Sequence, residues 1–324
     1  MSIEFFQRQN KQLNKLNVLT FPTHESYQSC LSKTGHEFYL LLGEGIKTWD
    51  NTYRPLPDNH HIIKTLPRNI SFDLVLSQNK FGQFPVAHKI ANELQIPLIS
   101  LEHTLPVPTW PQGHIKQLKQ QRGNVNVFIS NYSRGKWGWA DEEAVVITHG
   151  IDTELFTNQQ LSRIPQILSV CNDFRNRDWC CGFNFYQQAT NGLPTFPVGA
   201  TPGFSEPAKN TDELIKFYNE SLIFVNTSLV SPVPTSLLEA MACGCCVVST
   251  DTCMIPEVIE HNVNGYMCKN VSEMRFYLEK MLKNPELAME LGQKARQTII
   301  DRFSVNDFVN NWNKLFYETV RTFR

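Results

Sequence analysis

One stretch of the chain, residues 236–251, constrains the fold more than any other. It reads SLLEAMACGCCVVSTD, which is a polar start, a short run of small and apolar residues, a glycine and an apolar segment. Thr235 and Ser236 are residue types that cap helix starts, and Gly244 stands where such a helix should end. Residues 246–249 have the composition of a buried strand. The stretch therefore predicts a short helix followed by a strand.

The start of this helix is predicted to bind an anion. Its first-turn N–H groups, at about Thr235 to Leu237, have no partner inside the helix, and the positive end of the helix dipole lies beside them. Glu239 follows one turn later, within reach of anything bound there. A diphosphate with a ribose beside it fits this arrangement.

The length and composition of the chain indicate two domains, and its net charge does not favour any one class of binding partner. A chain of 324 residues with 41% apolar and 11% aromatic residues suffices for two cores. The net charge of -1 gives no overall attraction to nucleic acid or membrane. Apolar runs stay well short of the roughly 20 residues of a membrane span. The N-terminus has no signal-peptide pattern, so we expect a cytoplasmic protein without a transmembrane segment.

The first half of the chain alternates apolar runs with helix-like stretches, as a doubly wound α/β sheet does. Residues 86–94 carry apolar side chains at helical spacing. His24 and His103 come shortly after two of the runs, and ligands bind at that edge of open α/β sheets. The edge is the predicted wall of a cleft. The predicted strands are 16–21, 38–42, 72–76, 97–101, 125–130 and 144–148.

A second alternation predicts a smaller α/β domain. A linker continues to about residue 164, and only about four strands precede the terminal helices. Residues 272–323 have an amphipathic helical pattern, with a break at 303–305. The predicted strands of this half are 167–171, 195–198, 222–226 and 246–249.

These features resemble the nucleotide-sugar glycosyltransferases of the GT-B fold, in particular glycosyltransferase family 4. The resemblance is carried by the run Leu237–Gly244, by Pro256-Glu257-Val258, by Asn264-Gly265 and by His149-Gly150-Ile151-Asp152. It implies two Rossmann-like domains facing each other across a donor cleft. Residues 1–160 would form the acceptor-side domain and 161–305 the donor domain. The last helix, about 306–324, would cross back to the first domain.

The resemblance also implies roles for residues on the donor side. Glu239 would hold the ribose, because a carboxylate accepts two hydrogen bonds from a cis-diol. Fixed cations would stabilise the leaving diphosphate, and Arg177 is favoured over Arg175 for this role. Counting back eight residues from Glu239 gives Ser231, where the family has its first Glu near the donor sugar. The predicted donor-binding residues are Arg175, Arg177, Gly199, Ser231, Thr235, Ser236, Leu237 and Glu239.

His103 and His24 are the predicted catalytic residues. His103 follows a strand at a place where family 4 has a His near the donor sugar, and a neutral imidazole there could bond a sugar hydroxyl. His24 has a similar position after the first strand. The alternative for both is a histidine that only supports the structure.

The segment between Glu102 and Asp141 contains no acidic residue and carries five cations. Aromatic residues, among them Trp137 and Trp139, are interleaved with these cations. Cations neutralise phosphates and aromatics stack on bases or sugars, so this basic tract is a candidate surface for a phosphate-bearing or nucleic-acid acceptor. The alternative is a solvated helix face beside core tryptophans. The predicted acceptor-binding residues are Lys116, Lys119 and Arg122.

We therefore expect a hexosyl- or pentosyltransferase that moves a sugar from a nucleotide-sugar, most readily a UDP-sugar, to a hydroxyl acceptor. The resemblance implies retention of configuration. The chain has no Asp-x-Asp, so the sequence itself calls for no metal, and we expect no other cofactor. Residues 20–25 also resemble glycosyltransferases of T4-like phages, some of which modify DNA bases, and hydroxymethylated DNA is the alternative acceptor. A third hypothesis, prompted by Ser231, is a nucleotide-sugar-binding protein with little catalytic activity.

Overall fold

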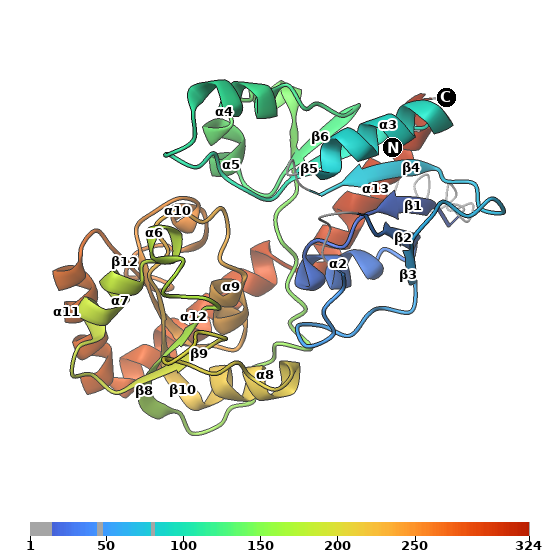
Figure 1. The fold of residues 1–324 in the computed structure, drawn as a ribbon. Coiled ribbons are helices and arrows are strands. Elements are labelled where there is room, and N and C mark those ends of the chain that lie inside the picture. Colours follow the sequence, from blue (N-terminus) through green and yellow to red (C-terminus); the bar gives the residue numbers. More distant parts are fainter. Residues whose placement is uncertain (1–14, 44–47, 79–81, 324) are drawn as a thin grey trace, which may run out of the picture.

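The computed structural model describes residues 15–43, 48–78 and 82–323. The described chain forms two α/β domains, each built on a parallel sheet, which are joined by an extended linker (Figure 1). The N-terminal residues 1–14, on which the prediction of no leader rests, lie outside the described residues. Among the described helices, none is long and apolar enough to cross a membrane.

The first domain contains a seven-stranded sheet in the order β3-β2-β1-β4-β5-β6-β7. All six predicted strands are confirmed; β3 was missed, because its two histidines and half-exposed edge position give it no apolar run. The strands are β1 (Asn17–Thr20), β2 (Glu37–Leu41), β3 (His60–Ile63), β4 (Leu74–Ser77), β5 (Leu98–Glu102), β6 (Val125–Phe128) and β7 (Val145–Val146). The helices are α2 (Glu25–Ser32), α3 (Gln83–Leu94), α4 (Gln112–Lys119), α5 (Asn131–Lys136) and the 3-10 turn η1 (Asp141–Glu143).

The second domain has five strands in the order β12-β11-β10-β8-β9, one more than predicted. The missed strand, β12, is too short to give a pattern. The strands are β8 (Ile164–Val170), β9 (Thr195–Val198), β10 (Ser221–Asn226), β11 (Cys246–Thr250) and β12 (Tyr266–Cys268). The helices are α6 (Asp178–Cys181), α7 (Phe183–Thr190), α8 (Thr211–Glu220), α9 (Thr235–Ala242), α10 (Ile255–Val258), α11 (Val271–Lys283) and α12 (Pro285–Arg302).

The strand orders locate the ligand-binding edges. The central strands β5, β10 and β11 are buried along their whole length, as expected for parallel sheets covered by helices on both faces. In the first sheet the order reverses between β1 and β4, and in the second between β8 and β10. Ligands of open α/β sheets bind beyond the carboxyl ends of strands at such reversals. The loops after β1, β8 and β10 are therefore the first places to look for a site.

The last helix, α13 (Val305–Phe323), returns to the first domain and packs on α2, as predicted (Figure 1). Trp312 is fully buried there and its indole N–H donates to the Tyr27 hydroxyl at 3.1 Å. Phe308 packs so close to Gly150 that a Cβ at position 150 would lie 2.6 Å from it. The predicted break near 303 is confirmed. A second break at Asn284 was missed, where Pro285 prevents α11 from continuing.

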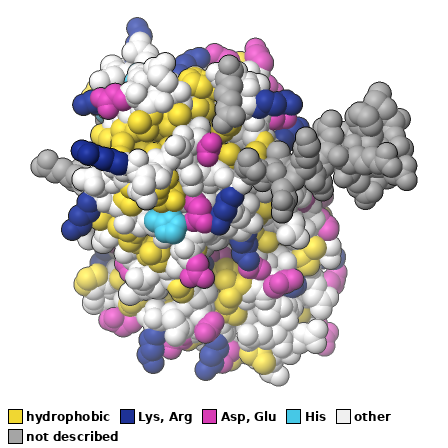
Figure 2. Space-filling view, turned by 90° about the vertical axis from the view of Figure 1, so that its right-hand side faces the viewer, with side chains coloured by type: hydrophobic (Ala, Val, Ile, Leu, Met, Phe, Trp, Pro, Cys, Tyr) yellow, Lys and Arg dark blue, Asp and Glu magenta, His cyan; other side chains and the backbone are white. Residues whose placement is uncertain are grey.

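The described surface on the face drawn in Figure 2 has basic and acidic side chains interspersed with hydrophobic ones. This agrees with the net charge of -1 and shows no field of a single sign on that face.

Candidate active site

A cavity of about 420 Å³ lies between the two domains, at the reversals of strand order. Its wall on the first domain includes His24, Tyr27, His103 and His149, and its wall on the second includes Asn172, Arg177 and Thr235. The cavity therefore joins residues that are far apart in the sequence. Both predicted catalytic histidines and the favoured arginine line it.

The helix α9 begins at this cavity, but not with the predicted cap. Pro234 is the residue before the helix, no side chain among the described residues caps α9, and Thr235 is the first helical residue. Pro232 and Pro234 explain the shift, because proline fixes an extended approach and prevents an earlier helical turn. The Leu237 amide donates to the Pro234 carbonyl at 3.0 Å. The first turn at Thr235 and Ser236 thus lacks a side chain that would compete with an anionic ligand for its amides.

Glu239 is almost entirely buried one turn further along α9. Its Oε1 accepts a hydrogen bond from Arg54 Nη2 at 2.8 Å, and its Oε2 accepts one from the Tyr218 hydroxyl at 3.1 Å. Burial raises the pKa of Glu239, while the Arg54 charge and the two hydrogen bonds act in the opposite direction. The residue lines a smaller cavity of about 70 Å³ behind the main one, which also contacts Thr235 and Arg54. The predicted ribose-binding carboxylate therefore lies beside the site with protein partners already in place.

The two candidate arginines point to different surroundings. Arg177 lines the main cavity, and its Nη1 lies 3.4 Å from the Asn172 carbonyl oxygen. Arg175 instead lies against the carbonyls of Pro202 and Gly203 and over the rings of Phe183 and Phe204. Of the two, only Arg177 is placed where it can contact a ligand in the main cavity.

Gly199 and Ser231 do not line the main cavity themselves but lie next to residues that do. Gly199 has a φ of 133°, and a Cβ there would lie 2.1 Å from the Cys171 carbonyl oxygen. The glycine is thus required by the packing of two loops, whatever the loop binds. Ser231 is half-buried and directly precedes Pro232 and Val233, which line the main cavity.

On the first-domain wall, His103 and His149 pack edge-on against Tyr27, and His24 packs against His103. The rings of His24 and His103 are 4.6 Å apart and those of His103 and His149 are 6.5 Å apart. Burial, followed by the neighbouring His24 and His149, holds the pKa of His103 well below its ordinary value, and burial lowers the pKa of His149 to about 3. Among the described residues, His103 Nε2 and His149 Nδ1 have no hydrogen-bond partner. Two neutral imidazoles are thus available to a ligand near neutral pH.

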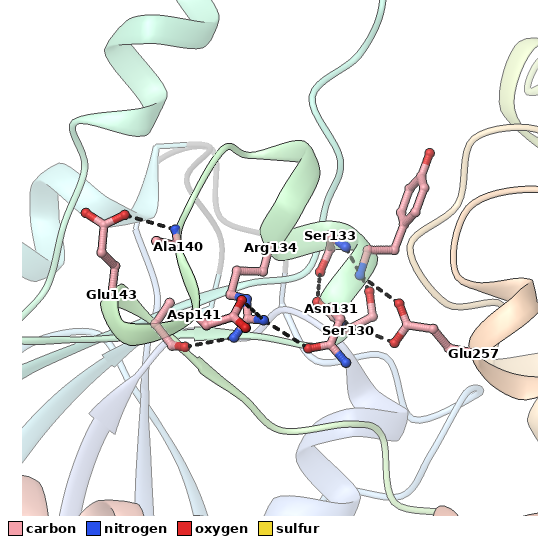
Figure 3. A network of polar contacts seen from close by, with 10 residues as sticks. Ser130, Asn131, Ser133, Arg134, Ala140, Asp141, Glu143 and Glu257 are labelled. Atoms are coloured by element: carbon pink, nitrogen blue, oxygen red, sulfur yellow. Dashed lines mark hydrogen bonds and ion pairs between the residues drawn. The ribbon is translucent and has the colours of Figure 1, made fainter.

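The basic tract is built differently from the prediction of interleaved aromatics. Trp137 and Trp139 belong to the core beneath α4 and α5, together with Leu118 and Phe128, so the alternative interpretation is confirmed for them. Arg122 stacks on the Trp139 ring and pairs with Glu143 at 3.0 Å. Arg134 pairs with Asp141, and this pair lies in the polar network of Figure 3. Lys116 and Lys119 lie in the last turn of α4, where cations favour the helix dipole.

The same network contains a contact between the domains. The Glu257 carboxylate, from the second domain, accepts hydrogen bonds from the backbone amides of Asn131 at 3.2 Å and Tyr132 at 2.7 Å (Figure 3). Within the first domain, Ser130 Oγ accepts from the Ser133 amide and caps the same helix, α5. A carboxylate at a helix start is electrostatically favourable, so Glu257 ties the two domains together.

The site residues that sequence reasoning missed include Tyr27, Tyr53, Arg54, His149 and Asn172. His149 had a usable signal, since it stands in the His-Gly-Ile-Asp segment that was used only as a domain boundary. Tyr53 and Arg54 lie in an irregular connection with no motif. They reach the site only because the domains face each other.

Comparison with known proteins agrees with this architecture. Residues 207–298, which include α9 and β11, match the family described as Glycosyl transferases group 1. The chain is 33% identical over 87 residues to the N-acetyl-alpha-D-glucosaminyl L-malate synthase of Bacillus anthracis, covering 26% of this chain and 23% of that one. It is 34% identical over 97 residues to the poly(ribitol-phosphate) alpha-N-acetylglucosaminyltransferase of Staphylococcus aureus, covering 29% and 20%. The matches thus span less than a quarter of either relative.

Solved structures resemble the chain over nearly its whole length. Anabaena HepE, solved with UDP and glucose, superposes with a TM-score of 0.73 at 14% identity, covering 94% of this chain and 100% of HepE. Sucrose-phosphate synthase from Thermosynechococcus elongatus gives 0.74 at 12% identity, covering 94% and 99%. At such identities the likeness concerns the fold alone. The chain has the GT-B fold of two facing Rossmann-like domains, and its residues 207–298 match the glycosyl transferases group 1.

Proposed function

We propose that this protein is a glycosyltransferase that moves a sugar from a UDP-sugar donor to a hydroxyl group of an acceptor. One observation carries the proposal: the main cavity faces the uncapped start of α9 and Arg177 on one side and His24 and His103 on the other. The first pair suits a diphosphate and the second suits a sugar. HepE, which shares the fold, was solved with UDP and glucose, and this supports UDP as the nucleotide.

In the proposed reaction the bond between the anomeric carbon and the diphosphate oxygen breaks, and a bond from that carbon to the acceptor oxygen forms. The acceptor proton passes to the leaving phosphate, and configuration is retained. Negative charge grows on the diphosphate as it leaves, so the α9 amides and Arg177 stabilise the transition state more than the ground state. Glu239 binds the ribose and His103 orients the reacting sugar through a neutral imidazole.

The experiment is a release assay for UDP with a panel of UDP-sugars and simple hydroxyl acceptors. We expect release with at least one donor, and transfer that persists in EDTA because the sequence has no Asp-x-Asp. Loss of all transfer in EDTA, restored by a divalent ion, would contradict the metal-independent mechanism. A cytoplasmic location belongs to the same proposal.

Ser231 supports a second candidate, a protein that binds nucleotide-sugars with little turnover. A carboxylate near the donor sugar is absent at that position, where the resembling family has its first Glu. UDP-sugar binding without release of UDP from any donor would favour this candidate over the enzyme.

A further inference from the structure

The connection between β2 and β3 reaches from the first domain to the donor side of the cleft. We call residues 49–56 of this connection the strap. Trp49 is buried against the His60 ring, and its indole N–H donates to the Arg54 carbonyl at 2.8 Å. The Asp50 amide donates to Glu25 Oε1 at 3.2 Å. The strap is therefore held in a defined conformation on the first domain.

The tip of the strap contacts the second domain at three points. The Tyr53 hydroxyl accepts from Asn172 Nδ2 at 3.1 Å. Arg54 donates from Nη1 to Thr211 Oγ1 at 3.2 Å and from Nη2 to Glu239 Oε1 at 2.8 Å. The Arg54 side chain is only 11% exposed, and its guanidinium lies 5.3 Å from the centre of the Phe156 ring. These contacts place a desolvated cation against the carboxylate that we assign to the ribose.

Both oxygens of Glu239 already have a protein partner, Arg54 at Oε1 and Tyr218 at Oε2, and the residue is almost entirely buried. Arg54 and Glu239 line the same small cavity of about 70 Å³, so a ribose diol that reached Oε1 there would compete with the Arg54 guanidinium for space. A donor that displaced Arg54 without satisfying Glu239 would leave a buried carboxylate short of a hydrogen bond, which is costly.

We propose that Arg54 is an internal competitor for the ribose site: it occupies Glu239 in the donor-free protein and is displaced when the nucleotide binds. The inference rests on the proposed function, since it takes Glu239 as the ribose anchor. Donor binding and release of the strap are then one coupled event. The measured association constant is then the intrinsic constant multiplied by the fraction of molecules in which Glu239 is free.

The test is calorimetric titration of UDP into the wild-type protein, Arg54→Ala and a control, Arg275→Ala. Arg275 pairs with Glu279 on α11 and lines neither cavity, so its variant should bind UDP as the wild type does. Arg54→Ala should bind UDP about tenfold more tightly, because a hydrogen bond to a charged group is commonly worth that much. Adding Glu239→Gln should then reduce affinity by a larger factor in the Arg54→Ala background than in the wild type.

A second measurement covers the case in which Arg54→Ala disturbs the fold. Hydrogen exchange at strap amides of the wild-type protein should accelerate when UDP is added, because the tip contacts are lost. Equal or weaker UDP binding by Arg54→Ala, together with unchanged or slower exchange in the strap, would overturn the inference alone. Absence of UDP binding in all three proteins would overturn the proposed function and, with it, this inference.

Discussion

The two walls of the cleft differ in how their residues are supplied. The second-domain wall comes mainly from two compact segments, the loop after β8 with Arg177 and the α9–β11 unit with Thr235 and Glu239. The first-domain wall is assembled from His24, the strap, His103 and His149, each from a different connection. A wall that comes from contiguous segments is visible in the sequence as a motif. A wall whose residues come from separate connections is visible only as isolated residues.

This difference also separates the electrostatics of the two sides. The second-domain wall carries a permanent cation and the positive end of a helix. The first-domain wall carries the buried imidazoles of His103 and His149, whose pKa values are lowered, so these two side chains are neutral near pH 7. The charged Glu25 and Arg54 on this side already contact protein groups. Arg177 and the start of α9 can therefore stabilise charge, whereas the two histidines contribute hydrogen bonds without adding charge.

Arg177→Ala should have the largest effect. Removing a fixed donor that acts on developing negative charge commonly costs about 2.7–4 kcal/mol, or roughly 100- to 1,000-fold in kcat. The matched control is Arg175→Ala, because Arg175 lies against the carbonyls of Pro202 and Gly203 and does not line the cavity. Steady-state kinetics with the best UDP-sugar measures both. Similar losses in the two variants would show that the division between these arginines is wrong.

His149→Gln should make the fold less sensitive to acid. Burial lowers the pKa of His149 to about 3 from 6.5, so between these values the unfolded chain binds a proton that the folded chain does not. Folded stability is therefore lost as pH falls from 6.5, by up to about 1.4 kcal/mol per pH unit. The variant should lose about 2 kcal/mol less than the wild type between pH 7 and pH 5. Urea unfolding at both pH values measures this.

The control for this prediction is His114→Gln, at an exposed position of α4. It should leave the difference between the two pH values unchanged. If His149→Gln kept the full acid sensitivity of the wild type, the assignment of a neutral imidazole to His149 would be wrong.

Glu257→Gln should cost about 0.5–1 kcal/mol, since it removes a charge from a helix start while keeping the side-chain shape. The matched control is Ser130→Ala, which removes the cap of the same helix from within the first domain. Both should lower the free energy of unfolding by similar amounts. Only Glu257→Gln should also change the spacing of the domains in small-angle scattering. Identical scattering of the two variants would contradict the role of Glu257 as a tie between the walls.

The fold was predictable from sequence because parallel sheets bury continuous apolar runs. The strands that were missed, β3 and β12, are an edge strand with two histidines and a three-residue strand. In the site, Arg177 and the α9 start carried signals, although prolines moved the predicted cap away from Thr235. The pairing of Arg54 with Glu239 had no local signal, because it joins residues 185 positions apart.

The smallest effect is expected from the basic tract. Trp137 and Trp139 are core residues and Arg122 is paired, so any polyanion would be held by phosphate contacts and not by stacking. We therefore expect weak binding of DNA at low salt, with single strands no tighter than duplex. Changing Lys116, Lys119 and Arg122 together to Gln should remove up to three phosphate contacts, which lowers the log–log salt slope on duplex DNA by up to about 2.7.

Transfer to a small hydroxyl acceptor should stay within about threefold after the same triple change, because the lining of the main cavity contains none of these three residues. Affinity for both forms of DNA between low and physiological salt, measured beside the transfer rate, tests the prediction. Binding that ignores the triple change would show that the tract is a solvated surface and would favour a saccharide or small-molecule acceptor. If the change instead abolished tight binding of single strands, a nucleic-acid acceptor would be favoured. The first-domain wall would then extend to α4, because cations on that helix would guide the acceptor toward His24 and His103.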